Sequence, residues 1–200
     1  MNEAANTGSH FVTLALLALY WVLLSFLPQM LSGPDGGMTG QKRGQAAGKK
    51  GPATAPSLAL EAVRKVDRLF DEASFLRGAL DAYESILKAY AAGDLTPVQR
   101  FVGPAVLEVF QSAIAERRQR QETLELMVVS IKAATIVDAL GEGDTVEIVV
   151  RYGSEMISVT RSADNLVVAG DPMRIIQVTD VWTFARSSQS AWALIATDCG

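Results

Sequence analysis

Few residues of this chain carry the side chains that covalent catalysis or metal binding requires. The 200 residues include one histidine, His10, which precedes a long apolar run, and one cysteine, Cys199, beside the C-terminus. A zinc site of Cys and His ligands and a Cys–His or Ser–His catalytic pair are therefore excluded. No glycine-rich phosphate loop and no Gly-x-Ser-x-Gly motif occurs. We expect no metal, no cofactor and no catalytic nucleophile.

Asp180 is the carboxylate whose position could support acid–base chemistry. Period-two spacing in a strand places it on the same face as Trp182, Phe184 and Arg186. A carboxyl group buried in an apolar cavity has a raised pKa and could serve as a general base. The alternative is a carboxylate at the rim of a sheet, solvated or paired with a neighbour. We adopt this second interpretation and expect no enzymatic activity.

The balance of charge restricts the partners. The net charge is −4, and residues 57–200 alone hold 14 basic and 20 acidic side chains. Nucleic-acid-binding domains present a basic face, so no nucleic-acid partner is expected. Hydrophobic residues make up 49% of the chain. This is the balance of an ordinary soluble protein, raised by one long apolar run near the N-terminus.

The apolar run from Phe11 to Leu31 predicts a transmembrane anchor. It contains no ionisable side chain apart from Tyr20. At about 1.5 Å per residue its helix would span a hydrocarbon core of about 30 Å. A cleaved signal peptide is the alternative, but it needs a basic N-terminal region and a small-residue cleavage site. Residues 1–10 contain no Lys or Arg, so we expect an uncleaved, single-pass anchor.

The segment after the anchor carries the basic residues that set its orientation. Residues 33–56 combine seven glycines and three prolines with Lys42, Arg43, Lys49 and Lys50. By the positive-inside rule, the domain that follows lies in the cytoplasm. The four basic side chains either rest on anionic lipid headgroups or only set topology and solubility. The expected organisation is a tail over 1–10, the anchor over 11–31, a flexible basic linker over 32–56 and a folded domain over 57–200.

Apolar residues at helical spacing dominate the first half of the folded domain. Residues 57–70 and, more regularly, residues 71–94 carry apolar stripes typical of amphipathic helices. Gly93 suits the left-handed end of the longer helix. Thr96 and Pro104 predict two further helix starts, the first by capping and the second by occupying the first helical position.

Three arginines, Arg117, Arg118 and Arg120, come at the end of the helix expected to begin at Pro104. Cations at this position complement the helix dipole, which is a sufficient structural reason for them. A contact with phosphate or with a partner protein is the alternative.

From Thr123 onward the apolar period becomes two, which predicts strands. The inward face of one such strand is Val146, Ile148, Val150 and Tyr152. Residues 141–144, GEGD, predict a turn, and Gly153–Ser154 predicts a bulge or bend. Helices followed by an antiparallel meander indicate an α+β fold, with helices on one face of a curved sheet.

Two tryptophans fall in the last two expected strands. Period two puts Trp182 and Phe184 on one face, and Trp192, Leu194 and Ala196 on one face of the next strand. In a hairpin of suitable register these side chains would form one aromatic surface beneath the long helix. That surface could anchor the core or line an apolar pocket within it, and both interpretations can hold together.

Three stretches resemble a known family: FLRGALDAYESILKAYAAGDL (75–95), AIAERR (113–118) and VTDVWTFAR followed by AWALIAT (178–197). Together they are similar to the C-terminal domain of the mitochondrial inner-membrane translocase's subunit forty-four, in its α-proteobacterial branch. The resemblance implies a cone-like α+β fold similar to nuclear transport factor two. In that fold, helices cover a curved antiparallel sheet and leave an apolar pocket.

The resemblance also implies a site and partners. The mitochondrial relative binds acidic lipid and tethers a chaperone to the import channel, but residues 1–56 contain no counterpart of its chaperone-binding region. Chaperone tethering is therefore not carried over. The residues expected to form the apolar, lipid-binding pocket are Phe75, Leu76, Ala79, Tyr83, Trp182, Phe184 and Trp192.

We therefore expect a membrane-anchored, non-enzymatic adaptor at the bacterial inner membrane. Its expected partners are membrane proteins of a translocation or assembly complex, with anionic lipid as a further contact. The alternative is a module that binds lipid or another apolar ligand between helix and sheet. A third hypothesis is a small-molecule enzyme, because the same cone supports isomerases and dehydratases. Asp180, Tyr83 or Tyr90 would then carry the proton.

Overall fold

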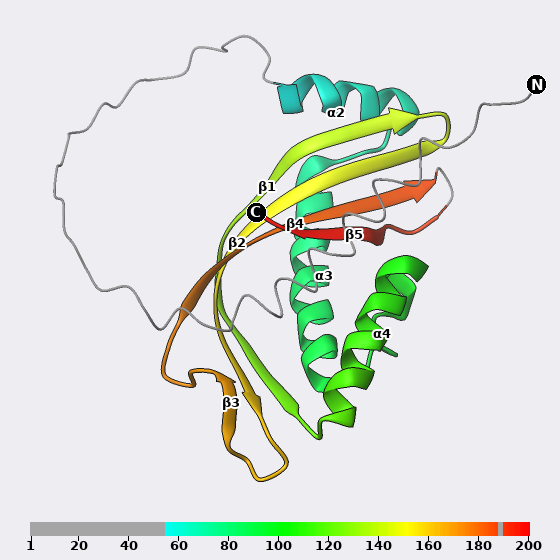
Figure 1. Cartoon of the computed structure of the whole chain (residues 1–200). Helices are drawn as coiled ribbons and strands as arrows, with labels where there is room; N and C mark the ends of the chain where they lie inside the picture. Colours follow the sequence, from blue (N-terminus) through cyan, green and yellow to red (C-terminus); the bar gives the residue numbers. More distant parts are fainter. Residues whose placement is uncertain (1–54, 188–189) are drawn as a thin grey trace, which may run out of the picture.

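Helices cover one face of a five-stranded antiparallel sheet in the computed structural model, which describes residues 55–187 and 190–200 (Figure 1). The expected α+β class is confirmed. The helical elements are α2 (Ala55–Val66), α3 (Glu72–Ala92), the 3₁₀ helix η1 (Gln99–Phe101) and α4 (Pro104–Gln119). The strands are β1 (Thr123–Glu142), β2 (Thr145–Arg161), β3 (Val167–Gly170), β4 (Ile176–Ser187) and β5 (Ala193–Cys199).

The long helix α3 begins and ends where the sequence predicts. Asp71 is the N-cap, and its side chain accepts a 2.8 Å hydrogen bond from the backbone N–H of Ser74. This bond satisfies one of the N–H groups that have no partner inside a helix. Gly93 closes the other end with φ of 74°, in the left-handed region that favours glycine. Between the caps, one stripe of the helix is buried: Phe75, Ala79, Tyr83, Ile86 and Ala89.

Two local predictions for the helices are wrong. The chain leaves the helix after Val66, and Phe70 lies in the connection to α3. Thr96 does not cap a helix. It lies in a turn, where its backbone N–H donates to the carboxylate of Asp94, and η1 begins only at Gln99. Only the short η1 forms in this stretch. The start of α4 at Pro104 agrees with the prediction.

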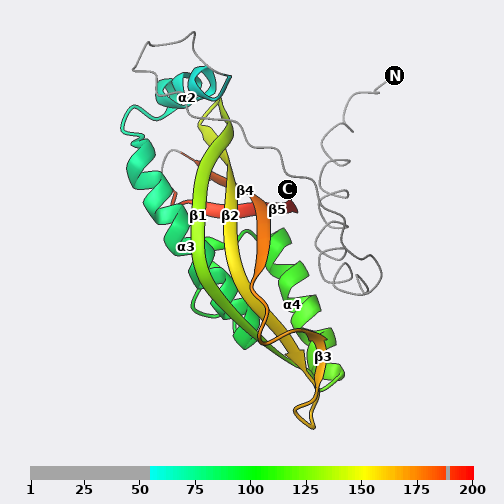
Figure 2. The same ribbon diagram turned by 90° about the vertical axis from the view of Figure 1, so that its left-hand side faces the viewer.

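The sheet has the strand order β1-β2-β4-β5, and β3 pairs with the end of β2. Its strands bend around α3 and α4, which lie inside the curve, and α2 lies at the end where β1 and β2 join (Figure 2). The predicted inward face of β2 is buried, including Val150 and Tyr152, and the turn between β1 and β2 falls at Gly143 and Asp144. The helices therefore pack on the concave face of the sheet.

The bulges between β1 and β2 lie in β1 rather than at the predicted position in β2, and one of them lies opposite Gly153 and Ser154. Gly153 and Ser154 remain in regular register with β4. In contrast, β1 has three register shifts against β2, with extra residues at Val129, Lys132 and Val137. Each extra residue bends its strand and increases the local twist. With these extra residues, β1 is longer than its partner β2 along the curve.

A further register shift changes the face of β5 that meets the core. Phe184 pairs with Leu194 but Thr183 pairs with Ala196, so Ile195 is the extra residue. Leu194 and Thr197 are buried in consequence, and the prediction that Ala196 shares the face of Leu194 is wrong. Trp192 lies just before the strand begins.

The described part of the chain contains no helix that is both long and apolar enough to cross a membrane. The expected anchor over 11–31 lies outside the described residues. So do the four basic residues of the expected linker, Lys42, Arg43, Lys49 and Lys50.

Candidate functional site

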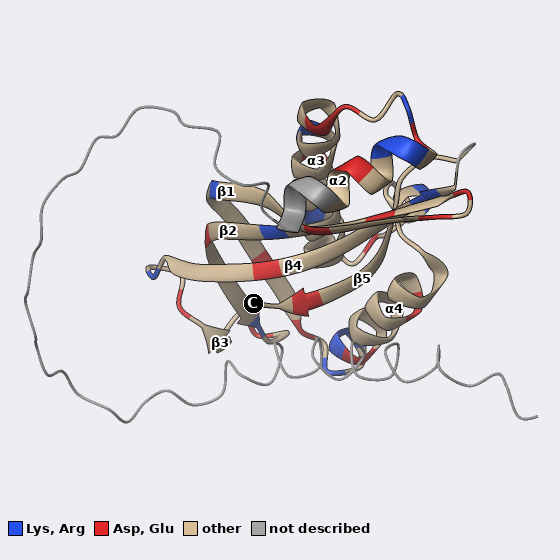
Figure 3. Ribbon diagram, turned by 90° about the horizontal axis from the view of Figure 1, so that it is seen from above, with Lys and Arg blue, Asp and Glu red and all other residues tan. Residues whose placement is uncertain are grey.

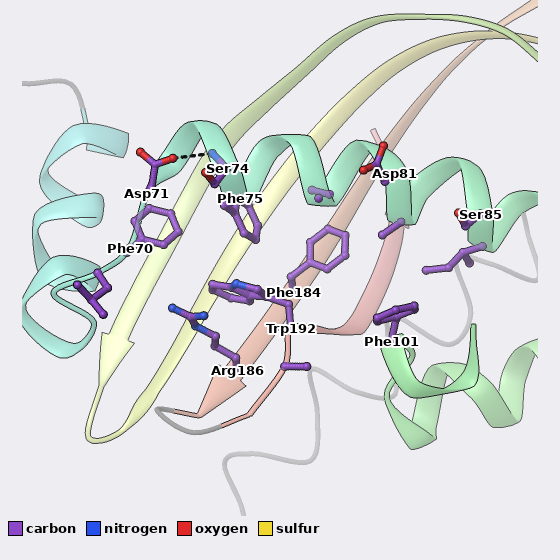
Figure 4. Close-up of a pocket in the computed structure, with 16 residues that line it drawn as sticks. Phe70, Asp71, Ser74, Phe75, Asp81, Ser85, Phe101, Phe184, Arg186 and Trp192 are labelled. Carbon is purple, nitrogen blue, oxygen red and sulfur yellow. Dashed lines mark hydrogen bonds between the residues drawn. The ribbon is translucent and has the colours of Figure 1, made fainter. Parts of the chain in front are cut away.

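A cavity of about 680 Å³, called here the large pocket, opens between the N-terminal half of α3 and the β4–β5 hairpin (Figure 4). Its walls are mainly aromatic and apolar, and they include Phe70, Phe75, Phe101, Phe184 and Trp192. Concave apolar cavities of this size are typical of binding sites for small apolar molecules. The large pocket is therefore the first candidate site.

Aromatic contacts between helix and hairpin hold this wall together. The ring of Phe75, on the buried stripe of α3, lies 4.7 Å from that of Trp192 and 5.9 Å from that of Phe184. Phe70, just before α3, approaches Trp192 at 6.3 Å with its edge. These separations lie in the range where aromatic pairs attract one another beyond the effect of their buried area. The predicted aromatic surface beneath α3 thus forms, although Trp192 reaches it from outside the strand.

Arg186 brings a positive charge to the same wall. Its guanidinium lies 4.8 Å from the ring centre of Trp192, and it forms an ion pair with Asp67 in the α2–α3 connection. The lining also includes polar side chains at the start of α3, among them its N-cap Asp71 and Ser74. An apolar molecule could thus enter with its polar end near charged side chains.

A chain of buried hydroxyl groups and a partly buried carboxylate lies beneath the middle of α3. Tyr83 donates a 2.5 Å hydrogen bond to Asp180 on β4. Since its one proton is used there, the Tyr83 oxygen accepts from the Ser154 hydroxyl at 3.0 Å. Tyr152, whose ring stacks on that of Tyr83 at 4.3 Å, donates to the carbonyl of Ala79. Helix and sheet are therefore joined by specific polar contacts as well as by apolar packing.

Burial determines the protonation of this chain of groups. It raises the pKa of the Asp180 carboxyl, while the hydrogen bond from Tyr83 acts in the opposite direction. Burial, the charge of Asp180 and the bond to it raise the pKa of Tyr83. Burial likewise raises the pKa of Tyr152. Both phenols consequently stay neutral near pH 7. The Asp180 carboxyl group is the member of the chain that loses its proton at the lowest pH.

The structure separates the predicted pocket residues into two groups. Four of them line the large pocket: Phe75, Ala79, Phe184 and Trp192. Leu76 packs against the core from a partly buried position. Tyr83 and Trp182 lie deeper, with their rings 4.7 Å apart, between α3 and the sheet.

Sequence reasoning missed several residues of the site. Phe101 reaches the large pocket from η1, and Asp67 reaches Arg186 from a connection that was expected to be helical. Neither Phe101 nor Asp67 belongs to an apolar pattern with the spacing of a helix or a strand. Ser154 could have been found, because period two places it on the buried face of Val150 and Tyr152.

The arginines of α4 bind the end of α3 (Figure 3, where the end of α4 is blue). Arg117 is buried, and it donates to the carbonyl oxygens of Tyr90 at 2.8 Å and Ala91 at 3.1 Å. Arg118 donates to the carbonyl of Gly93. The last carbonyls of a helix lack the usual intrahelical donor; that of Tyr90 also accepts from the Gly93 N–H, and the arginines add donors from a neighbouring element.

Within the described residues, no group of three His, Cys, Asp or Glu side chains is arranged to hold a metal ion. Asp180 and its neighbours therefore offer hydrogen bonds and one titratable carboxyl group.

Comparison with known proteins places the chain in a family. The crystal structure of the intermembrane space region of the chloroplast protein ARC6 is similar with a TM-score of 0.46 and 12% sequence identity. The match covers 62% of this chain and 95% of that one. None of the curated proteins compared with the chain matches it. The model of the Tim44-like domain matches residues 57–199, which confirms the resemblance found in the sequence. The chain therefore belongs to the Tim44-like domain family.

Proposed function

We propose that this protein is a membrane-anchored, non-enzymatic adaptor that acts in protein translocation or membrane-protein assembly at the bacterial inner membrane. The observation that carries the proposal is the Tim44-like domain over residues 57–199. An apolar run over 11–31 precedes that domain in the sequence. The anchor would hold the domain on the cytoplasmic side, close to membrane-protein partners. Confinement of this kind raises effective concentration, so a weak intrinsic contact is sufficient.

In-cell photo-crosslinking tests the adaptor function. Probes on the exposed surface of the domain should capture one or a few membrane proteins of a translocation or assembly complex. Capture should fall when residues 11–31 are deleted, because the domain then leaves the bilayer. Recovery of the same abundant proteins with and without the anchor contradicts the proposal. Extraction of the intact chain from membranes by carbonate contradicts the anchor itself.

We further propose that the fold is the cone-like arrangement similar to nuclear transport factor two. The strong bend of the sheet around α3 and the large pocket at one end of that helix support this assignment. A lipid or another apolar ligand is the second candidate function. The observation that favours it is the aromatic wall of Phe75, Phe184 and Trp192 with Arg186 beside it.

Native mass spectrometry of the protein purified from cells tests the second function. A retained apolar molecule, displaced when the pocket is filled by a larger side chain, is the expected result. A protein that retains no such molecule and takes none up from a lipid extract contradicts it. The adaptor proposal does not depend on this outcome.

The absence of catalysis is part of the proposal. The carboxylate that could act as a base, Asp180, accepts a hydrogen bond from Tyr83, and the domain over 57–200 contains no histidine. Turnover of a substrate by the wild type that is lost in Asp180→Asn, with the fold intact, contradicts this part.

A further inference from the structure

A second cavity, of about 190 Å³, lies between the C-terminal half of α3, α4 and the concave face of the sheet. We call it the small cavity. The small cavity and the large pocket share one lining residue, Ile86. Aromatic rings contribute to its walls from three elements: Tyr90 on α3, Phe110 on α4 and Trp182 on β4. None of these rings belongs to the wall of the large pocket.

The charged residues of the small cavity all have the same sign. Asp180 lies on its wall and Asp198 lies at its exposed rim, whereas no Lys, Arg or His is among the lining residues. Buried carboxylates in proteins are normally paired with a cation or fully hydrogen-bonded. Asp180 is partly buried and has no counter-ion among the residues that line the space.

Only one oxygen of the Asp180 carboxylate is used by the described residues. Tyr83 donates to Oδ2, and no described donor bonds to Oδ1. No buried side-chain oxygen of the described residues is left without a partner, so Oδ1 is not sealed off. Asp180 lines the small cavity, so a donor placed there can reach its carboxylate. Tyr83 fixes the orientation of the carboxylate through its bond to Oδ2.

The size of the cavity limits what could supply that donor. An apolar cavity of about 150 Å³ accommodates benzene, so this one has room for a six-membered ring with a short polar extension. Faces of Trp and Tyr attract organic cations, and they do so more strongly where water is excluded. An ammonium group would also form a charge-assisted hydrogen bond with a carboxylate, about twice as strong as a neutral one.

We propose that the small cavity binds a small organic cation, namely a primary amine on an apolar body about the size of a benzene ring. The ammonium group donates to Asp180 Oδ1, and the apolar body lies among Tyr90, Phe110 and Trp182. This site is separate from the large pocket and from the adaptor function proposed above. Within it, Asp180 is the residue that holds the ammonium group.

Calorimetric titration of the purified full-length chain with benzylamine and benzyl alcohol tests the proposal. The two probes have the same ring and length and differ in charge. All variants are measured in the same detergent, so uptake of probe by micelles is common to them. The wild type should bind benzylamine at least about tenfold more tightly than benzyl alcohol, because only the amine forms the charge-assisted bond. Equal affinities, or a preference for the alcohol, overturn the proposal.

Asp180→Asn and Asp198→Asn form a matched pair, since both remove one carboxylate from the lining. Asp180→Asn should bring the two probes to within about twofold, while Asp198→Asn should keep the preference of the wild type. A preference that survives Asp180→Asn, or that both variants reduce equally, overturns the proposal.

A third variant keeps the test decisive if Asp180→Asn does not fold. Ser158→Leu fills the small cavity from β2 without touching the hydrogen bond between Tyr83 and Asp180. Its circular dichroism spectrum should match the wild type, and it should lose binding of both probes by at least about tenfold. Unchanged binding of benzylamine in this variant places the amine elsewhere and overturns the assignment.

Discussion

Tyr83 donates a 2.5 Å hydrogen bond to Asp180, and this bond joins the middle of α3 to β4 across 97 positions of the sequence. Behind it, Ser154 on β2 supplies the donor that the Tyr83 oxygen still needs. The Tyr83 phenol is fully buried and the Asp180 carboxylate is partly buried, so both lose contacts with water that such partners replace. The bond thus fixes the position of the helix along the sheet as well as stabilising the contact.

The stability of the fold should depend on pH through Asp180. Burial raises the pKa of this carboxyl group in the folded state above its value of about 3.9 in an unfolded chain. The folded state therefore keeps the proton at pH values where the unfolded chain has lost it. The contribution of Asp180 to the free energy of unfolding is largest below about pH 4 and falls as the pH rises through the folded-state pKa. Asp180→Asn removes this dependence.

Urea unfolding of wild type and Asp180→Asn from pH 4 to 8 measures the effect. The stability of the variant relative to the wild type should increase with pH over this range. Glu155→Gln is the matched control, because bonds from Lys132 and Ser130 lower the pKa of Glu155. Its stabilisation is lost as the pH falls below about 4.5, so the Glu155→Gln difference should be constant above pH 5. A difference for Asp180→Asn that stays constant or declines with pH contradicts the prediction.

Arg117→Lys should destabilise the fold by about 1.5–3 kcal/mol, the range for hydrogen bonds that involve a charged group. The guanidinium reaches the carbonyl oxygens of Tyr90 and Ala91 together and lies 5.2 Å from the ring centre of Tyr90. Both hydrogen bonds leave Nη2, and a lysine ammonium keeps the charge but has no planar guanidinium to lie against the Tyr90 ring at the same time. Chemical denaturation measures the difference.

Arg120→Lys is the control for that change. Arg120 is exposed and pairs with Glu122 at the surface. Its replacement should change stability by less than about 0.5 kcal/mol. If both substitutions change stability by similarly small amounts, Arg117 acts only through its charge near the helix end, which lysine keeps.

Local periodicity and helix-end signals were sufficient to predict α3, the start of α4 and the buried face of β2. The buried stripe of α3 follows from helical spacing, its end follows from Gly93, and the start of α4 follows from Pro104. The buried face of β2 follows from period two. These features depend on interactions within a few residues, which a single sequence records directly.

The parts that could not be predicted depend on contacts between distant segments. Ile195 is the extra residue of β5 and Val129 is one of those in β1, and no local residue type marks either position as a bulge. The bond between Tyr83 and Asp180 likewise requires the register of helix on sheet. Period two placed Asp180 on the correct face, but its partner follows only from the fold.

The same substitution should have opposite effects at two glycines of α3 and its cap. Gly78 lies within the helix, and a Cβ added there meets no atom within 4 Å. Gly78→Ala should therefore stabilise the fold by about 0.5–1 kcal/mol, the usual gain over glycine inside a helix. Gly93 has φ of +74°, so Gly93→Ala should cost about 1–2 kcal/mol from backbone strain. Melting temperatures that move in the same direction for both variants contradict the assignment of these roles.

Filling the large pocket should separate ligand binding from stability. Ala82 lines this pocket on α3, whereas Ala73 is exposed on the same helix outside it. Ala82→Phe should reduce the affinity for a fluorescent fatty-acid analogue at least about fivefold, because the ring occupies the space of the ligand. Ala73→Phe adds the same side chain without entering the pocket, so its affinity should equal that of the wild type. Fluorescence titration and thermal unfolding of both variants give the comparison. Equal binding by Ala82→Phe and wild type, with both folded, would show that an apolar ligand does not use the wall built by Phe75 and Trp192.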